Sequence, residues 1–298
     1  MSKAYEWPGL LITPGPAIAI LGLLLGNLIL TLGDVAIKAI GSVSGLFQYL
    51  ALRQIISLIL VYPFWSQLSV SQRQPGVLGI HMVRGHLSLL GGICALYALL
   101  HLSLATANVI FYAAPLVTLL LARIWLKQTL TRIQITQVCL GFAGVLIALR
   151  PDDIHWAALS ALVVAFTLAL FNLLTCKMPE DQTMRGMVFW SNLTALPLTA
   201  ILAIIFWHPI QTNMLLLAFI VSLTTGFYQV IAARAYRSND AGEIVIAEYS
   251  GLLFALLLGV WWFNEPAHWY TLLGILLIIL PICWQSLRLW RQRNKPVI

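Results

Sequence analysis

The chain has 298 residues, of which 60% are hydrophobic and only 9% charged, and its formal net charge is +7. Soluble domains carry about 25% charged residues, so this composition excludes an ordinary soluble enzyme or binding domain. The positive charge lies mostly between long apolar stretches, where membrane topology explains it, and nucleic-acid binding is therefore not expected. No GxxxxGK[ST] motif occurs, which argues against an ATP-driven pump.

Ten segments are long and apolar enough to be membrane-spanning helices, which need about 20 mostly apolar residues. In chain order they are Ala17–Ile40, Gly45–Trp65, His86–His101, Ala105–Trp125, Ile133–Leu149, Trp156–Cys176, Met187–Trp207, Met214–Tyr236, Ala241–Phe263 and Trp269–Leu287. Together they use most of the chain. The sequence therefore predicts an all-α membrane protein with ten transmembrane helices in a lipid bilayer.

The distribution of Lys and Arg predicts how the helices are oriented. If the N-terminus is inside, all but three of the 17 basic residues fall on the inner side. Lys38 and Arg150 fall on the outer side, and Arg53 lies within a span. Cytoplasmic loops carry an excess of Lys and Arg, so we expect a multi-pass protein of the bacterial inner membrane with both termini in the cytoplasm.

Two stretches of the chain resemble each other, because Ala105–Thr129 aligns without a gap to Gly242–Pro266. The corresponding pairs are Tyr112 with Tyr249, Trp125 with Trp262, Gln128 with Glu265 and, in spans one and six, Lys38 with Lys177. Since each copy holds five spans, an odd number, the copies insert in opposite directions, as in many secondary transporters. We expect two inverted-topology five-helix repeats, residues 1–150 and 151–298, around a central cavity that binds the substrate.

Three further stretches carry a family resemblance. Arg84–Pro115 has an Arg-Gly start, a small-residue helix, an Ala-x-Ala turn and a proline; Gly141–Pro151 reads GFAGVLIALRP; Arg234–Glu265 covers the end of span eight through span nine. Together they resemble the drug/metabolite transporter superfamily, EamA branch. The resemblance implies a secondary transporter that works by alternating access. Export of amino acids or related metabolites is the leading function, and uptake of S-adenosylmethionine, riboflavin or a similar substrate is the alternative.

The chain departs from the family pattern at two places. The acidic residue after span four is Gln128 here, whereas Glu265 retains it after span nine. In early span nine, the Ala-Pro pair often found in the family is Ala247–Glu248. The following Tyr249 matches a subset of the family that has Glu-Tyr at this point.

Glu248 lies inside a long apolar stretch, where an acid costs roughly 2.5–3.5 kcal/mol at a helix centre. Such residues usually line a water-filled path or pair with another polar group. Burial favours the neutral form of a carboxyl group, so Glu248 suits proton-coupled transport. The alternative is a hydrogen-bonded acid with a purely structural role.

Three other charged residues lie in the first two spans. Asp34 and Lys38 are four residues apart and share a helix face, so they form either a self-neutralising pair or a site in which Asp34 faces the cavity. Arg53 needs a carboxylate, carbonyl groups or water inside the membrane. Asp34 is the expected structural partner of Arg53, with substrate contact as the alternative. Arg53 and Lys38 are therefore each candidates for gating or for an ion pair with an acidic residue.

The remaining candidates for substrate binding are polar and aromatic residues inside predicted spans: Asn108, Phe111, Tyr112, Asn172, Tyr228, Gln229 and Tyr249. Asn108 and Tyr112 share one face of span four. Aromatic and amide groups together can hold a zwitterion or a flat ring, and aromatic faces also favour cations. The alternative is that the amides hold helices together.

Proline and glycine positions predict helix bends and close packing. Pro115 and the pair Gly91–Gly92 are expected to bend spans four and three beside the cavity. Gly141 and Gly144 suit close helix packing, with contact between protomers of a homodimer as one option and a monomer as the other.

No cofactor or metal site is expected. The six histidines lie at predicted span ends without metal-ligand spacing, and the four cysteines lie in spans without a CxxC pattern. An intramembrane enzyme would need a paired acid, a Ser-His set or a metal cluster, and the sequence shows none. A lipid flippase is the other rival class, and a small-molecule substrate is the expected partner.

Overall fold

The computed structural model describes residues 16–42, 44–125, 127, 129, 131–149, 155–179, 181–238 and 247–293. Every regular element in this part of the chain is a helix. In chain order they are α1 (Pro16–Ile40), α2 (Leu46–Trp65), α3 (Val70–Arg73), α4 (Leu78–His101), α5 (Leu104–Phe111), α6 (Ala114–Trp125), α7 (Arg132–Leu149), α8 (Trp156–Thr175), α9 (Met184–Ile205), α10 (Thr212–Ser238), α12 (Ser250–Phe263) and α13 (Trp269–Arg293).

Eight helical segments of the described chain are long and apolar enough to cross a membrane. One of them is Leu104–Trp125, which joins α5 and α6. Two further apolar helices, Ser250–Phe263 and Trp269–Trp284, are shorter. The chain is therefore an all-helical, multi-pass membrane protein, as its composition predicts.

The largest difference from the predicted spans is at α4, which begins at Leu78 rather than at His86. The predicted spans place Arg84 in an inner loop, but it lies within α4 and is only 3% exposed. Its guanidinium donates to the Phe171 carbonyl at 2.7 Å and to the Thr175 hydroxyl, and lies 3.8 Å from the Phe171 ring centroid. Helix α4 is longer because α8 supplies these partners for a buried cation.

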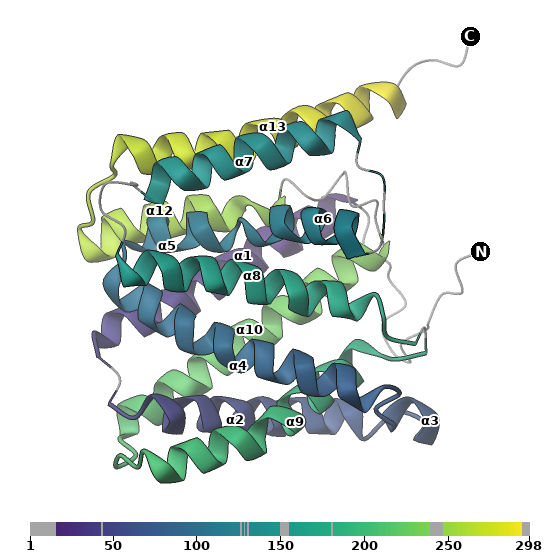
Figure 1. Ribbon diagram of the computed structural model, residues 1–298, viewed down its shortest axis with the longest axis vertical. Coiled ribbons are helices and arrows are strands. Elements are labelled where there is room, and N and C mark those ends of the chain that lie inside the picture. Colours follow the sequence, from purple (N-terminus) through teal and green to yellow (C-terminus); the bar gives the residue numbers. More distant parts are fainter. Residues whose placement is uncertain are drawn as a thin grey trace.

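The helices lie side by side, with α7 and α13 along one edge of the bundle and α2 and α9 along the opposite edge (Figure 1). The most extensive contacts are α1 with α10, α4 with α8, α7 with α13 and α2 with α9. If the long segments are numbered one to ten in chain order, with α5 and α6 as one, these are pairs 1–8, 3–6, 5–10 and 2–7. If each segment is exchanged with the one five places away (one with six, two with seven, and so on), pair 1–8 becomes pair 6–3, and the pairs 5–10 and 2–7 stay the same. The whole set of pairs is therefore unchanged by the exchange.

Glycines allow the closest of these contacts. A Cβ at Gly144 of α7 would lie 2.7 Å from the Gly274 carbonyl oxygen of α13, and a Cβ at Gly274 would lie 2.8 Å from the Gly144 carbonyl oxygen. Gly141 faces Leu116 of α6 in the same chain. Gly141 and Gly144 therefore pack within one chain.

The fourth and ninth segments are both interrupted at a tyrosine. Tyr112 and Ala113 separate α5 from α6, and Tyr249 separates helical residues 247–248 from α12. The two tyrosines have similar backbone angles, φ −70° and ψ −1° at Tyr112 and φ −80° and ψ 0° at Tyr249. Pro115 has no N–H to continue the helical ladder, which accounts for the interruption predicted in span four. We call these two interruptions the helix breaks.

Helix α4, in contrast, runs through Gly91 and Gly92 without interruption. These glycines admit neighbouring side chains instead. A Cβ at Gly91 would lie 2.8 Å from the Thr167 hydroxyl of α8, and a Cβ at Gly92 would lie 2.9 Å from a guanidinium nitrogen of Arg53.

Candidate functional site

The two helix breaks meet inside the bundle, where their tyrosine rings are in contact. The ring centroids of Tyr112 and Tyr249 are 5.6 Å apart, with 44° between the ring planes. Tyr249 is buried, and the Tyr112 hydroxyl packs on Gly251, where any added Cβ would collide with it. The tyrosines that the internal alignment pairs are therefore neighbours in space.

A buried amide from α1 connects both helix breaks. The Nδ2 of Asn27 donates to the carbonyls of Ala247 at 2.9 Å and Glu248 at 3.1 Å, and contacts the Ser250 hydroxyl at 3.3 Å. Its Oδ1 accepts a hydrogen bond from the Tyr112 hydroxyl at 3.5 Å. Asn27 is 0% exposed. Asn27 is not among the candidates predicted from the sequence, although an amide in the middle of an apolar run is a signal that points to it.

Glu248 lies beside the second helix break and is partly buried. Its Oε1 accepts a hydrogen bond from the Tyr228 hydroxyl of α10. The Tyr228 ring also packs on α1, 3.4 Å from the position of a Cβ at Gly26. The structure thus brings two predicted site residues, Glu248 and Tyr228, into direct contact.

Asp34 and Asn108 form a second polar pair. The Nδ2 of Asn108 donates to Asp34 Oδ2 at 3.2 Å and to the Leu104 carbonyl at 3.1 Å. Asn108 is 5% exposed, and Phe111 in the next turn packs against the apolar core. Of the two alternatives for Asp34, the self-neutralising pair with Lys38 is not formed among the described residues, because the carboxylate partner of Lys38 is another residue.

That partner is Glu265, whose Oε1 lies 2.9 Å from Lys38 Nζ. Lys38 also donates to the carbonyls of Leu99 at 3.3 Å and Leu102 at 2.6 Å, at the end of α4. The other oxygen of Glu265 accepts from the Leu104 backbone N–H at 2.8 Å, at the start of α5. The two side chains are 15% and 13% exposed. We call this set of contacts the Lys38–Glu265 latch.

Lys177, which corresponds to Lys38 in the second repeat, shares only its aromatic contact with Lys38 among the described residues. Lys38 lies 5.7 Å from the Phe263 ring centroid, and Lys177 lies 6.0 Å from that of Trp125. Gln128, which aligns with Glu265, lies outside the described residues and carries no charge.

Four polar groups follow one face of α1 at intervals of three or four residues. They are Asn27, Thr31, Asp34 and Lys38. The Thr31 hydroxyl donates to the Asn27 carbonyl at 2.8 Å, and the other three contact the helix breaks, Asn108 and Glu265, respectively. We call these four residues the α1 polar stripe.

Arg53 is not joined to Asp34 by an ion pair in the described part of the chain, contrary to the structural partner expected for it. Its guanidinium lies against Gly92, and its carbonyl accepts from the Ser222 hydroxyl at 3.0 Å. A gating role for Arg53 stays a prediction.

Asn172 and Gln229 are not hydrogen-bonded to this cluster in the part of the chain that the structure describes. Asn172 is exposed on α8, and Gln229 is partly buried on α10, one position after Tyr228. Their roles in substrate binding stay predictions.

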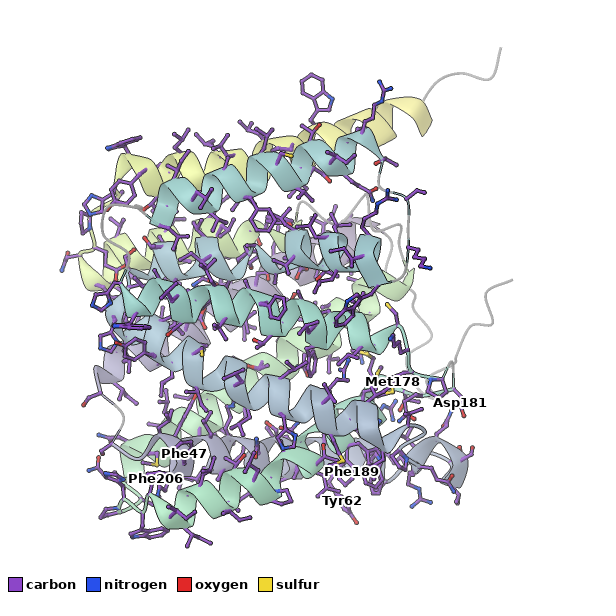
Figure 2. All side chains as sticks on the ribbon, in the orientation of Figure 1. Phe47, Tyr62, Met178, Asp181, Phe189 and Phe206 are labelled. Carbon is purple, nitrogen blue, oxygen red and sulfur yellow. The ribbon has the colours of Figure 1, made fainter. Side chains whose placement is uncertain are left out.

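No group of three or more His, Cys, Asp or Glu side chains with metal-binding geometry occurs among the described residues. A cavity of about 10 Å³, enough for roughly one water molecule, lies beside Glu265. A recess of about 450 Å³ lies elsewhere, lined by Trp65, Val70, Arg73, Gln74, Pro75 and Trp190. The ring of Phe189, labelled in Figure 2, stacks on Trp65 with 4.0 Å between the ring centroids, so Phe189 lies next to this recess.

Known proteins share this architecture. The S-adenosylmethionine uptake transporter of Rickettsia prowazekii (strain Madrid E) is 24% identical over 251 residues, covering 84% of this chain and 85% of that protein. The pseudopaline exporter CntI of Pseudomonas aeruginosa (strain UCBPP-PA14) is 23% identical over 234 residues, covering 76% and 81%. One crystal structure shares the fold with a TM-score of 0.60 at 17% identity, covering 94% of this chain and 99% of its own.

The EamA-like transporter family is matched twice, by residues 17–150 and by residues 155–286. These matches cover most of the chain, and the similar proteins are transporters rather than enzymes. The chain therefore belongs to the EamA-like transporter family, within the drug/metabolite transporter group.

Proposed function

We propose that this protein is a ten-helix secondary transporter that moves a small metabolite across the bacterial inner membrane by alternating access. The observation that carries the proposal is the contact between the helix breaks at Tyr112 and Tyr249. In secondary transporters, discontinuous helices at the interface of two repeats bind the substrate near the membrane midplane. Two interrupted helices in contact, with the carboxyl group of Glu248 beside one of them, support such a site here.

The pairing of helices supports inverted repeats at residues 1–150 and 151–298. The four most extensive helix contacts form a set that is unchanged when each segment is exchanged with the one five places away. Five spans in each half require the halves to be oppositely oriented in the membrane. The same organisation allows one half to rock against the other around a central site.

The residues around the breaks favour a substrate with a cationic group and an apolar or flat part. Glu248 and Asp34 are hydrogen-bonded to neutral partners, Tyr228 and Asn108, in the contacts described above. A cationic group that binds either carboxylate forms an ion pair as well as a hydrogen bond, and both are strengthened where water is excluded. Tyr112 and Tyr249 offer aromatic faces to the rest of the molecule.

Two candidate functions meet this requirement. Export of amino acids or related metabolites follows from the sequence resemblance, and an amino group is the cation. Uptake of S-adenosylmethionine is the second candidate, because the similar Rickettsia protein is named as an uptake transporter for that molecule. The similar Pseudomonas protein is named as an exporter, so flux has to be measured in both directions.

A thermal-shift screen of the purified protein against amino acids, S-adenosylmethionine and riboflavin tests this proposal. A ligand present at 100 times its Kd stabilises the folded protein by about 2.7 kcal/mol. We expect a cationic metabolite to raise the melting temperature and to be transported by protein reconstituted in liposomes. Stabilisation by phospholipid alone, with no flux of any soluble metabolite, would favour a lipid flippase and overturn the proposal.

Tyr112→Ala and Tyr62→Ala form a matched pair for the same screen. Tyr112 lies at the proposed site, whereas Tyr62 is 55% exposed near the end of α2 (Figure 2). We expect Tyr112→Ala to weaken binding of the identified ligand at least tenfold and Tyr62→Ala to leave it unchanged. Equal affinities in the two variants would remove Tyr112 from the site.

A further inference from the structure

The side chain of Asn27 replaces hydrogen bonds that the second helix break removes. In a continuous helix, the Glu248 carbonyl would accept from the N–H of Leu252. Here the Leu252 N–H bonds to the Tyr249 carbonyl at 3.1 Å instead. The Glu248 carbonyl therefore loses its helical donor, and Asn27 Nδ2 supplies a donor at 3.1 Å.

This replacement is needed because the break lies in the bundle interior. Without water, every backbone carbonyl inside the membrane requires a donor from the protein. Asn27 is 0% exposed and reaches both the Ala247 and the Glu248 carbonyls. It also accepts from the Tyr112 hydroxyl, so a single side chain of α1 connects the two breaks.

We infer that Asn27 is a positioning residue that holds the second helix break in place and thereby orients Glu248 toward Tyr228. The expected loss of transport rests on the proposed function, whereas the expected change in the orientation of Glu248 does not. Glu248 immediately precedes the break, and its own carbonyl is held by Asn27. A change in backbone direction at this point rotates the carboxyl group away from the Tyr228 hydroxyl that it accepts from.

The carbodiimide DCCD provides a direct measure of this orientation, because it modifies protonated carboxyl groups in apolar surroundings. Peptide mapping by mass spectrometry reports the extent of modification at Glu248 without any substrate. We expect Asn27→Leu to change that extent at least threefold and to reduce transport at least tenfold. Wild-type modification of Glu248 in Asn27→Leu would overturn the inference.

Asn192→Leu is the matched control. Asn192 also lies in an apolar helix, α9, but its Nδ2 donates within its own helix, to the Val188 carbonyl at 2.9 Å. We expect this variant to keep wild-type modification of Glu248 and wild-type transport. The same change at Glu248 in both variants would show a general effect of removing an amide from a membrane helix and would overturn the specific role of Asn27.

Two conservative variants separate hydrogen bonding from size. Asn27→Asp preserves the size of the side chain but loses the N–H donors, whereas Asn27→Gln keeps the donors and adds a methylene group. If Asn27 acts as a donor, Gln preserves more of the Glu248 modification pattern than Asp. The reverse order would show that the shape of the side chain matters and would overturn the inference. These variants also supply the test if Asn27→Leu does not fold.

The modification data separate the two proposals from each other. If the wild-type protein transports no metabolite, the proposed function fails, while the modification of Glu248 still tests Asn27. If transport is found and Glu248 modification is independent of Asn27, the function stands and the positioning role fails.

Discussion

The environment of Glu248 explains how an acid is tolerated inside this bundle. Its carboxyl group accepts from the Tyr228 phenol, and the backbone carbonyl of the same residue accepts from Asn27. A phenol hydroxyl can donate to a carboxyl group in both of its protonation states, so this hydrogen bond persists when the acid loses or gains a proton. We therefore expect Glu248 to couple substrate movement to a proton gradient.

Replacing Glu248 with Gln tests this coupling. The amide keeps nearly the same size but does not titrate, so we expect gradient-driven flux in liposomes to fall at least tenfold while the protein remains folded. Asp181→Asn serves as the control, since Asp181 is exposed in the loop after α8 (Figure 2). Wild-type flux in Glu248→Gln, with an unchanged response to an imposed pH gradient, would contradict proton coupling through this residue.

Apolar context alone is enough to select several of these residues. It predicts Glu248, Asp34 and Asn108 because polar groups within apolar runs are expensive, and the structure gives each of them a hydrogen-bonding partner. The identity of those partners is not predictable, because it depends on which helices become neighbours. Spacing along α1 assigns Lys38 to Asp34, but Glu265, over 200 positions away, is its partner.

At the level of helices, the Lys38–Glu265 latch ties four elements together at one end of the bundle. Lys38 extends from α1 to the last carbonyls of α4, and Glu265 extends from the loop after α12 to the first N–H of α5. Cations favour helix C-termini and anions favour helix N-termini. The direction of the ion pair is therefore fixed by the backbone groups around it.

Charge reversal tests this dependence on the backbone. Lys38→Glu or Glu265→Lys alone leaves two like charges in a largely buried site, so each is expected to destabilise the protein by at least the roughly 3–5 kcal/mol lost when a buried pair is broken. The double variant restores opposite charges but places a carboxylate on α1 against the carbonyls of Leu99 and Leu102. We therefore expect its melting temperature to stay close to those of the single variants. Full recovery in the double variant would show that only the attraction between the two side chains matters.

Helix bounds can be predicted more fully than helix interruptions. The apolar runs predict most of the described ends to within a few residues, and the largest exception, α4, extends over a cation whose partners lie on α8. The break at Tyr112 is indicated by Pro115. The break at Tyr249 has no proline in the first turn of α12, and the amide that donates to its carbonyls comes from Asn27, 220 positions before Ala247 in the chain.

At the level of the whole molecule, the positive-inside rule predicts that the Lys38–Glu265 latch is at the outer face. Gln211 lies just before α10 and Gln67 just after α2, at opposite ends of the bundle, and both are exposed. After the four native cysteines are replaced by serine, we expect Gln211→Cys to react with an impermeant maleimide on intact cells. Gln67→Cys should react only after permeabilisation, and the opposite pattern would invert the predicted topology.

The contact between Gly144 and Gly274 has a consequence for how mutations affect such a transporter. This contact joins α7 and α13, the fifth helix of one half and the fifth helix of the other, so exchanging the halves leaves the pair unchanged. The Lys38–Glu265 latch, in contrast, is at one end of the bundle only. A side chain at either glycine would separate α7 from α13 whichever side of the membrane the site faces. We therefore expect substitutions at Gly144 to reduce the amount of folded protein without favouring either direction of opening, so that α7 and α13 serve as a fixed support rather than a moving part.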